Sequence, residues 1–187
     1  MFERQLIREK LEQAADILNE LDIDVWLTFV RETSLSPDPA LELIFDGDVT
    51  WQSAFLIGRD GRRTAILGHY DAENVRTLGT YTEVVPYHEG IRQPLLAALA
   101  DYAPRSIAVN YSEDDVAADG LSYGMYRLLQ NYLAGTPWEG RPVSAEAIIR
   151  ALRGRKTPTE IELVRQAVVT TERIFDEIEA YVHPGMT

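Results

Sequence analysis

The chain has 187 residues, of which 45% are apolar, and its 30 acidic and 18 basic side chains give a formal charge of -12. This composition is typical of a globular protein, and its acidity argues against a nucleic-acid partner, which requires a basic surface. The absence of cysteine excludes disulfides, thiolate catalysis and cysteine-ligated metal sites.

The first half of the chain predicts a helix followed by strands. Ile7, Leu11, Ala14, Leu18 and Leu21 recur every three or four residues, which places them on one helix face. Residues 25–30 form a short apolar run typical of a buried strand. Residues 31–50 are irregular, with one turn of helix expected within 40–45. Residues 51–57 and 62–67 then predict a hairpin around a Gly-Arg-Asp-Gly turn.

The second half alternates helices and strands. The pattern predicts helices at 72–78, 91–102, 121–133 and 145–152, strands at 82–87 and 106–110, and a Gly/Pro-rich link at 134–143. No strand is expected after residue 110. The alternation indicates an α/β fold in which helices are layered on a mixed β-sheet.

The last predicted element is one long amphipathic helix at 158–182. Thr157-Pro158-Thr159-Glu160 has the pattern of a capping box with proline at the first helical position. His183-Pro184-Gly185 predicts the end of the helix. An apolar stripe follows one face, and we expect it to pack on a second copy of the same helix or to fold back onto its own domain. The stripe consists of Ile161, Val164, Val168, Phe175, Ile178 and Val182.

One motif suggests serine catalysis. Residues 120–124 read Gly-Leu-Ser-Tyr-Gly, the G-x-S-x-G pattern of esterases, and Asp176 and His183 follow Ser122 in the order of a hydrolase triad. However, residues 116–119 make a poor strand, and this chemistry requires a strand that leads directly into the serine turn. We therefore interpret Ser122 as a helix start, and a free-standing esterase remains an alternative.

A metal site is the second possibility that the residues raise. His69, Asp71 and Glu73 are close in sequence, and His88-Glu89 could lie near them. Residues 88–92 have arginine where the H-E-x-x-H motif needs its second histidine. We expect these to be polar residues at strand ends, with no stoichiometric transition metal at His69 or His88. The acidic residues 113–119 lack the spacing of a calcium loop and predict a solvated segment.

The C-terminal residues resemble a known family. Residues 149–153 read Ile-Arg-Ala-Leu-Arg, residues 156–167 read Lys-Thr-Pro-Thr-Glu-Ile-Glu-Leu-Val-Arg-Gln-Ala, and residues 184–187 read Pro-Gly-Met-Thr. This succession is similar to the domain junction of creatinase/prolidase-type proteins, the Xaa-Pro aminopeptidases and dipeptidases. The resemblance implies that residues 1–152 form a creatinase-type, ribonuclease-H-like N-terminal domain. Residues 153–187 would then be a linker and the first helix of a pita-bread metallopeptidase domain.

The resemblance also implies a truncated, non-catalytic chain. The family's two divalent metal ions (Mn, Co or Zn) are held by two Asp, one His and two Glu downstream of the Pro-Gly-Met-Thr phrase, so no catalytic, cofactor-binding or metal-binding residue is assigned here. In the family this domain supports dimers and lends loops to the mouth of the catalytic site. We therefore expect a homodimer, a substrate-gating role for Arg31 and the 31–50 loop, and a parent that cleaves peptides with an Xaa-Pro bond or a related small molecule.

Two further expectations complete the prediction. No uninterrupted apolar run approaches the roughly 18 residues of a membrane span, and the charged first helix is unlike a signal peptide, so we expect a cytoplasmic protein without a membrane partner. Besides the esterase, the remaining alternative is an acidic binding module without a catalytic parent.

Overall fold

The computed structural model describes residues 2–183 and 185–186, so Pro184 and Thr187 of the Pro-Gly-Met-Thr phrase lie outside the described residues. The helices are α1 (Phe2–Glu20), α2 (His69–Leu78), α3 (Arg92–Tyr102), α4 (Tyr123–Leu133), α5 (Glu146–Gly154), α6 (Pro158–Tyr181) and the short 3-10 helix η1 (Leu41–Leu43). The strands are β1 (Val25–Val30), β2 (Ser53–Gly58), β3 (Arg63–Gly68), β4 (Glu83–Tyr87), β5 (Ile107–Val109) and β6 (Pro142–Ser144). The predicted α/β fold with a mixed sheet is confirmed.

The six strands form one sheet in the order β4-β3-β2-β1-β5-β6. The predicted hairpin is confirmed, with β2 antiparallel to both β1 and β3. The other pairs, β3 with β4, β1 with β5 and β5 with β6, are parallel. The chain therefore moves from β1 in one direction, through β2 and β3 to β4, and returns across the sheet to β5.

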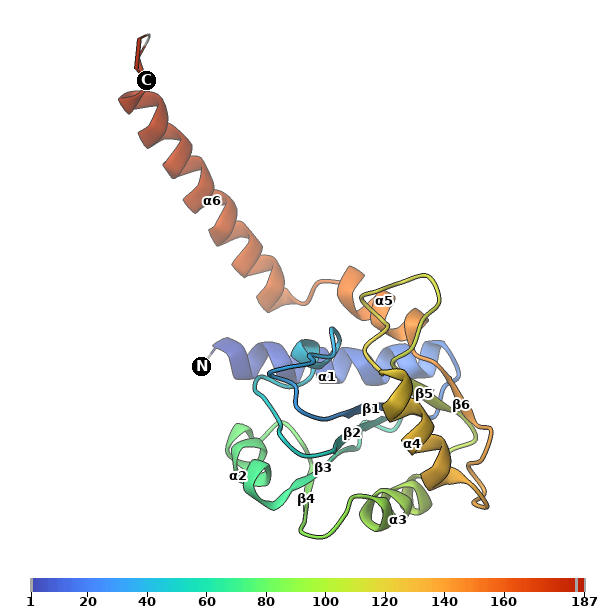
Figure 1. Cartoon of the computed structure of the whole chain (residues 1–187). Helices are drawn as coiled ribbons and strands as arrows, with labels where there is room; N and C mark the ends of the chain where they lie inside the picture. Colours follow the sequence, from blue (N-terminus) through green and yellow to red (C-terminus); the bar gives the residue numbers. More distant parts are fainter. Residues whose placement is uncertain (1, 184, 187) are drawn as a thin grey trace.

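Alternation along β1 creates two hydrophobic cores, one on each side of the sheet. Trp26 and Val30 face a core that α1, α2 and α5 cover, whereas Val25, Leu27 and Phe29 face a second core under α3 and α4 (Figure 1). Both faces of β1 are buried, which explains why its sequence is an apolar run without polar alternation. Leu21 departs from the predicted helical stripe: it lies in the turn after α1 and is exposed.

Strand β6 corrects the prediction that residues 134–143 are only a link and that no strand follows residue 110. Residues 142–144 pair in parallel with β5 at the edge of the sheet. The strand has three residues, none of them buried, so it lacks the apolar run that identifies a strand in sequence.

Helix α6 begins as predicted and then leaves the domain. The Thr157 hydroxyl accepts a hydrogen bond from the Glu160 N–H at 3.3 Å, and the Glu160 carboxylate accepts one from the Thr157 N–H at 2.7 Å, which confirms the capping box. Beyond its first turn the helix projects away from the sheet (Figure 1). Its stripe is exposed, with Val168 at 50% and Phe175 at 67%. The expectation that the helix folds back onto its own domain is therefore wrong.

Two adjacent residues of α1 hold the base of α6. The Glu9 carboxylate accepts hydrogen bonds from the Thr159 hydroxyl at 2.7 Å and from its N–H at 3.2 Å, and these bonds, the hydroxyl first, lower the pKa of Glu9 to about 2. The Lys10 ammonium is buried, donates to the carbonyls of Leu152 at 2.6 Å and Arg155 at 3.0 Å, and pairs with Glu160 at 2.7 Å. We call Glu9 and Lys10 the α1 clamp, because together they fix where α6 starts relative to the sheet.

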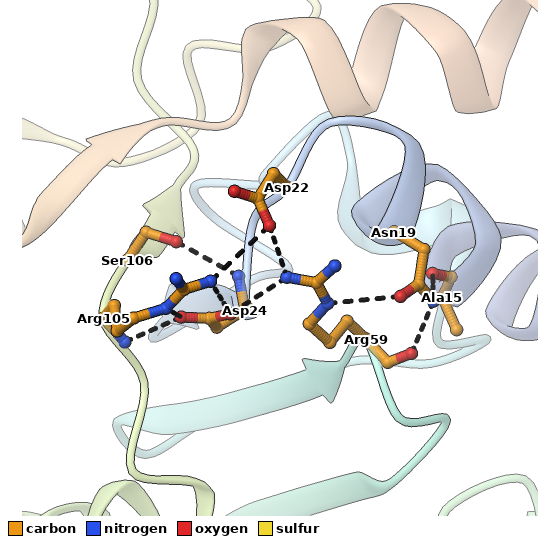
Figure 2. Close-up of polar contacts among 7 residues, drawn as sticks. All are labelled: Ala15, Asn19, Asp22, Asp24, Arg59, Arg105 and Ser106. Carbon is orange, nitrogen blue, oxygen red and sulfur yellow. Dashed lines mark hydrogen bonds and ion pairs between the residues drawn. The ribbon is translucent and has the colours of Figure 1, made fainter.

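A polar network surrounds Asp24, the residue that directly precedes β1. The Asp24 carboxylate accepts hydrogen bonds from the Arg105 N–H at 2.8 Å, its guanidinium at 3.2 Å and the Arg59 guanidinium at 3.2 Å (Figure 2). Hydrogen bonding to Arg105 is the largest of the causes that lower the pKa of Asp24 to about 2. Arg59 also bonds to Asn19 and Asp22, so the network joins the α1–β1, β2–β3 and α3–β5 connections.

The helices were also compared with the requirements for a membrane span. In residues 2–183 and 185–186, no helix combines the length and the apolar character needed to cross a bilayer.

Candidate functional site

The topology of the sheet places a crevice beside the carboxyl end of β1. Strands β1 and β5 are parallel neighbours, but the chain leaves β1 toward β2 and leaves β5 toward β6. Ligand sites of open α/β sheets lie at such reversals, where the two departing loops separate. The departing loops here are residues 31–52 and residues 110–122.

The first hollow of this crevice has a volume of about 580 Å³ and lies between the two loops. Tyrosine and proline side chains contribute to its wall, and the rings of Tyr111 and Tyr126 meet edge to face with centroids 5.9 Å apart. Asp119 is the one charged residue in the lining. The lining residues are Ser36, Pro37, Pro39, Tyr111, Ser112, Asp119, Gly120, Leu121, Ser122, Tyr123 and Tyr126. We call this hollow the tyrosine pocket.

A second hollow of about 630 Å³ contains Arg31. Trp51 and Tyr87 contribute aromatic rings with centroids 5.9 Å apart, and the Tyr87 hydroxyl donates to the Gln52 carbonyl at 2.7 Å. Burial raises the pKa of Tyr87 to about 12. The lining residues are Arg31, Glu32, Thr50, Trp51, Gln52, Tyr87, His88, Glu89 and Gly90. A narrower cavity of about 130 Å³ shares Arg31 and Glu32 with this hollow and Ser36, Gly120 and Ser122 with the tyrosine pocket.

A buried carboxylate anchors the loop that separates the two hollows. Asp38 accepts hydrogen bonds from the Ala40 N–H at 2.8 Å and from the Asn110 amide at 2.9 Å, and Asn110 in turn accepts from the Trp26 indole at 2.6 Å. Burial raises the pKa of Asp38 above its ordinary value, while the Asn110 hydrogen bond acts in the opposite direction. The loop after β1 is thus bonded through Asp38 to the residue after β5.

Gly120 belongs to the same arrangement. A Cβ atom at this position would collide with the Asp38 carboxylate. The first glycine of the Gly-Leu-Ser-Tyr-Gly motif therefore has a structural explanation, because only glycine allows the 110–122 loop to approach Asp38 so closely.

Ser122 is the N-cap of α4, as the sequence interpretation stated. Its hydroxyl accepts a hydrogen bond from the Met125 N–H at 3.4 Å, and the strand that precedes it, β5, ends at Val109. Asp176 lies in α6 and His183 follows that helix, which extends away from the domain (Figure 1). The structure thus does not assemble the residues of the esterase alternative.

The structure does bring two histidines together. Gly68 of β3 pairs with Tyr87 of β4, so His69 and His88, the next residues, lie side by side with ring centroids 4.4 Å apart and planes inclined by 29°. Nearly parallel rings direct their nitrogen lone pairs past each other and not toward one ion. Asp71, two residues after His69, instead accepts hydrogen bonds from the backbone N–H groups of residues 50 and 51.

The remaining acidic residues do not change this result. Across residues 2–183 and 185–186, no group of three or more His, Asp or Glu side chains is arranged to hold a metal ion. The described residues thus do not fit the two-metal centre that the resemblance implies for a catalytic parent. Ser112 and Asp115 organise the acidic segment through backbone hydrogen bonds, in accord with a solvated loop.

The sequence predicted a role for Arg31, which stays a prediction, and gave no indication of the tyrosine pocket. Its walls come from residues more than seventy positions apart, and Tyr111, Tyr123 and Tyr126 occur in segments interpreted as loop and helix. The reversal of strand order between β1 and β5 would have indicated a ligand site at this position. The β1–β5 pairing that reveals this reversal is not specified by any local sequence pattern.

Comparison with solved structures identifies proteins of the same fold. The Xaa-Pro dipeptidase from Bacillus anthracis superposes with a TM-score of 0.61 and 19% identity over 97% of this chain and 45% of its own. The X-Pro aminopeptidase from Thermotoga maritima gives 0.61 and 20% over 95% and 45%. The N-terminal domain of Xaa-Pro dipeptidase from Lactobacillus brevis gives 0.52 and 11% over 75% and 98%. No protein-family model and no curated protein sequence matches the chain.

These similarities confirm the fold that the resemblance implied. The chain has the fold of the N-terminal domains of Xaa-Pro peptidases, the creatinase-type α/β domain, here followed by a long helix. It spans less than half the length of the first two proteins.

Proposed function

We propose that this chain is the non-catalytic N-terminal part of a metal-dependent Xaa-Pro peptidase. The observation that carries the proposal is the pattern of coverage. Three quarters of this chain matches almost the whole of the isolated N-terminal domain from Lactobacillus brevis. The two longer peptidases match nearly all of this chain, including the part that the isolated domain leaves unmatched. The extra matched part supports a division near residue 152, with residues 153–187 as a linker and the first helix of a metallopeptidase domain.

The proposed role of the domain is to support dimers and to gate substrate access. Arg31 favours the second role, because it follows β1 directly, is exposed and lines a hollow together with the aromatic residues Trp51 and Tyr87. The loop that carries it is anchored by Asp38, so its position is defined before any partner binds. A peptide carboxylate is the substrate group that a guanidinium would hold there.

The test extends the coding sequence beyond codon 187 and assays both products on Xaa-Pro peptides with added manganese, cobalt or zinc. We expect the longer product to hydrolyse them and the 187-residue chain to be inactive. In the longer product, Arg31→Met should raise KM several-fold with less effect on kcat, because the arginine would contact substrate and not the metals. Arg92→Met is the matched control. A coding sequence without downstream metal ligands, or turnover by the short chain itself, would contradict the proposal.

The dimer proposal rests on the exposed stripe of α6. Ile161, Val164, Val168, Thr171, Phe175, Ile178 and Val182 alternate at spacings of three and four, a heptad pattern that suits pairing with a second helix. An apolar stripe left in water favours association, and an isologous pair of helices is the simplest closed arrangement.

We therefore expect the chain to sediment as a dimer and the Val168→Asp, Phe175→Asp double variant to sediment as a monomer. Each aspartate would place a charge in the helix–helix contact. The control is Gln166→Asp with Thr170→Asp, which adds the same charge away from the stripe and should leave the dimer intact. A wild-type monomer, or equal behaviour of the two double variants, would show that the stripe does not pair.

A further inference from the structure

The tyrosine pocket has the chemistry of a cation site. Tyr111, Tyr123 and Tyr126 contribute three aromatic rings, and the faces of aromatic rings attract cations, most strongly where water is partly excluded. Pro37, Pro39 and Leu121 add apolar surface. The lining contains one carboxylate, on Asp119, and no lysine, arginine or histidine.

The surroundings of the pocket are also negative. Glu113, Asp114 and Asp115 lie in the loop that leads to Asp119. Within the described part of the chain, none of these four carboxylates has a basic group within 4.0 Å. Glu146, which accepts a hydrogen bond from the hydroxyl of the lining residue Ser112, is paired with Arg150. With a formal charge of -12 on the whole chain, the potential at this edge attracts cations.

Two positive features border the pocket and do not reverse this preference. The amino end of α4 carries partial positive charge, but the Ser122 hydroxyl caps it by accepting from the Met125 N–H. Arg127 lies one turn further along α4, where its guanidinium donates to the Tyr123 hydroxyl at 3.4 Å, and it is not part of the lining. An anion would meet no full positive charge in the pocket and one full negative charge.

We propose that the tyrosine pocket binds a small organic cation of the alkylammonium class. The apolar substituents of the ammonium would contact the tyrosine rings and prolines, while Asp119 supplies the opposite charge. The position agrees with the rule that ligands bind where the strand order reverses, because the pocket lies between the loops that leave β1 and β5. This site is independent of the peptidase proposal, since it uses no metal and its lining shares no residue with the Arg31 hollow.

Choline and its uncharged isostere 3,3-dimethyl-1-butanol test the proposal, because they share shape and differ in charge. Titration of the 187-residue chain, followed by NMR shifts or calorimetry, should give saturable choline binding with a Kd near or below about 1 mM, corresponding to roughly 4 kcal/mol. The alcohol should bind at least about fivefold more weakly. Added salt should lower the affinity for choline and leave the affinity for the alcohol unchanged, because salt screens charges.

Variants locate the site. Asp119→Asn should weaken choline binding about two- to fivefold, the range for an exposed ion pair, and should leave the alcohol unaffected. Tyr126→Leu, which keeps the apolar bulk and removes the aromatic face, should weaken choline about threefold or more. The matched controls are Asp176→Asn and Tyr181→Leu on α6, which should change neither Kd. Equal affinity for the two probes, no saturable binding, or an unaffected Asp119→Asn variant would overturn the proposal, and circular dichroism establishes that each variant is folded.

Discussion

Replacement of Lys10 by methionine is expected to lower the free energy of unfolding by about 3 kcal/mol, within the range for breaking a buried ion pair. Methionine fills a similar volume but leaves the Leu152 and Arg155 carbonyls and the Glu160 carboxylate without their shared donor. Urea unfolding followed by tryptophan fluorescence, to which the buried Trp26 contributes, measures the loss.

The chain contains its own control for this experiment. Lys156 is the only other lysine, and it is exposed. Lys156→Met should change stability by less than about 0.5 kcal/mol, as surface substitutions do. Hydrogen exchange should also accelerate in the first turn of α6 in Lys10→Met, because the α1 clamp holds that turn. Similar losses in the two lysine variants would contradict the assignment of a buried structural role to Lys10.

Asn110→Leu should cost about 4 kcal/mol at neutral pH, the sum of an orphaned buried donor and a lost hydrogen bond to a carboxylate. Asn110 is buried, accepts from the Trp26 indole at 2.6 Å and donates to Asp38 at 2.9 Å. Leucine matches its size and can satisfy neither group. Asn131→Leu, on the exposed face of α4, is the matched control and should be nearly neutral.

The loss should also depend on pH, and its sign follows from Asp38. Burial raises the pKa of Asp38 above its ordinary value, so ionisation of this group disfavours the folded state increasingly as pH rises through and above 3.8. The Asn110 hydrogen bond lowers this pKa, and its removal raises the pKa further. The deficit of Asn110→Leu should therefore shrink as the pH falls and Asp38 takes up its proton. A deficit that grows on acidification would show that Asp38 is not involved.

Local patterns predicted most of the elements because each carries its own signal. The Thr157–Glu160 capping box defined the start of α6, and the turn with Asp60 and Gly61 defined the hairpin. Strand β6 has no such signal, because its three residues are half-exposed and depend on pairing with β5. The loop after β1 was correctly predicted as irregular, but the burial of Asp38 depends on Asn110, seventy-two positions away.

The α1 clamp could be predicted from the sequence only in part. Lys10 is three residues from Ile7 and four from Ala14, so a charged residue stands within the apolar stripe of α1. That position indicates a buried lysine with a partner, but it does not identify the partner. The acceptors come from the junction of α5 and α6, which only the three-dimensional fold brings to α1.

The network around Asp24 determines which edge of the domain can change shape. Three chain connections share one carboxylate there, so no one of them can lengthen or shift alone without breaking bonds to the other two (Figure 2). The loop between Arg31 and Trp51 at the far end of β1 is bonded at separate points instead. Asp38 accepts from Asn110, Asp71 accepts from the N–H groups of residues 50 and 51, and Arg153 and Tyr81 donate to the carbonyls of Pro39 and Ile44. Insertions that diversify the two hollows would therefore be tolerated at one edge of the sheet, while the other edge keeps a constant frame.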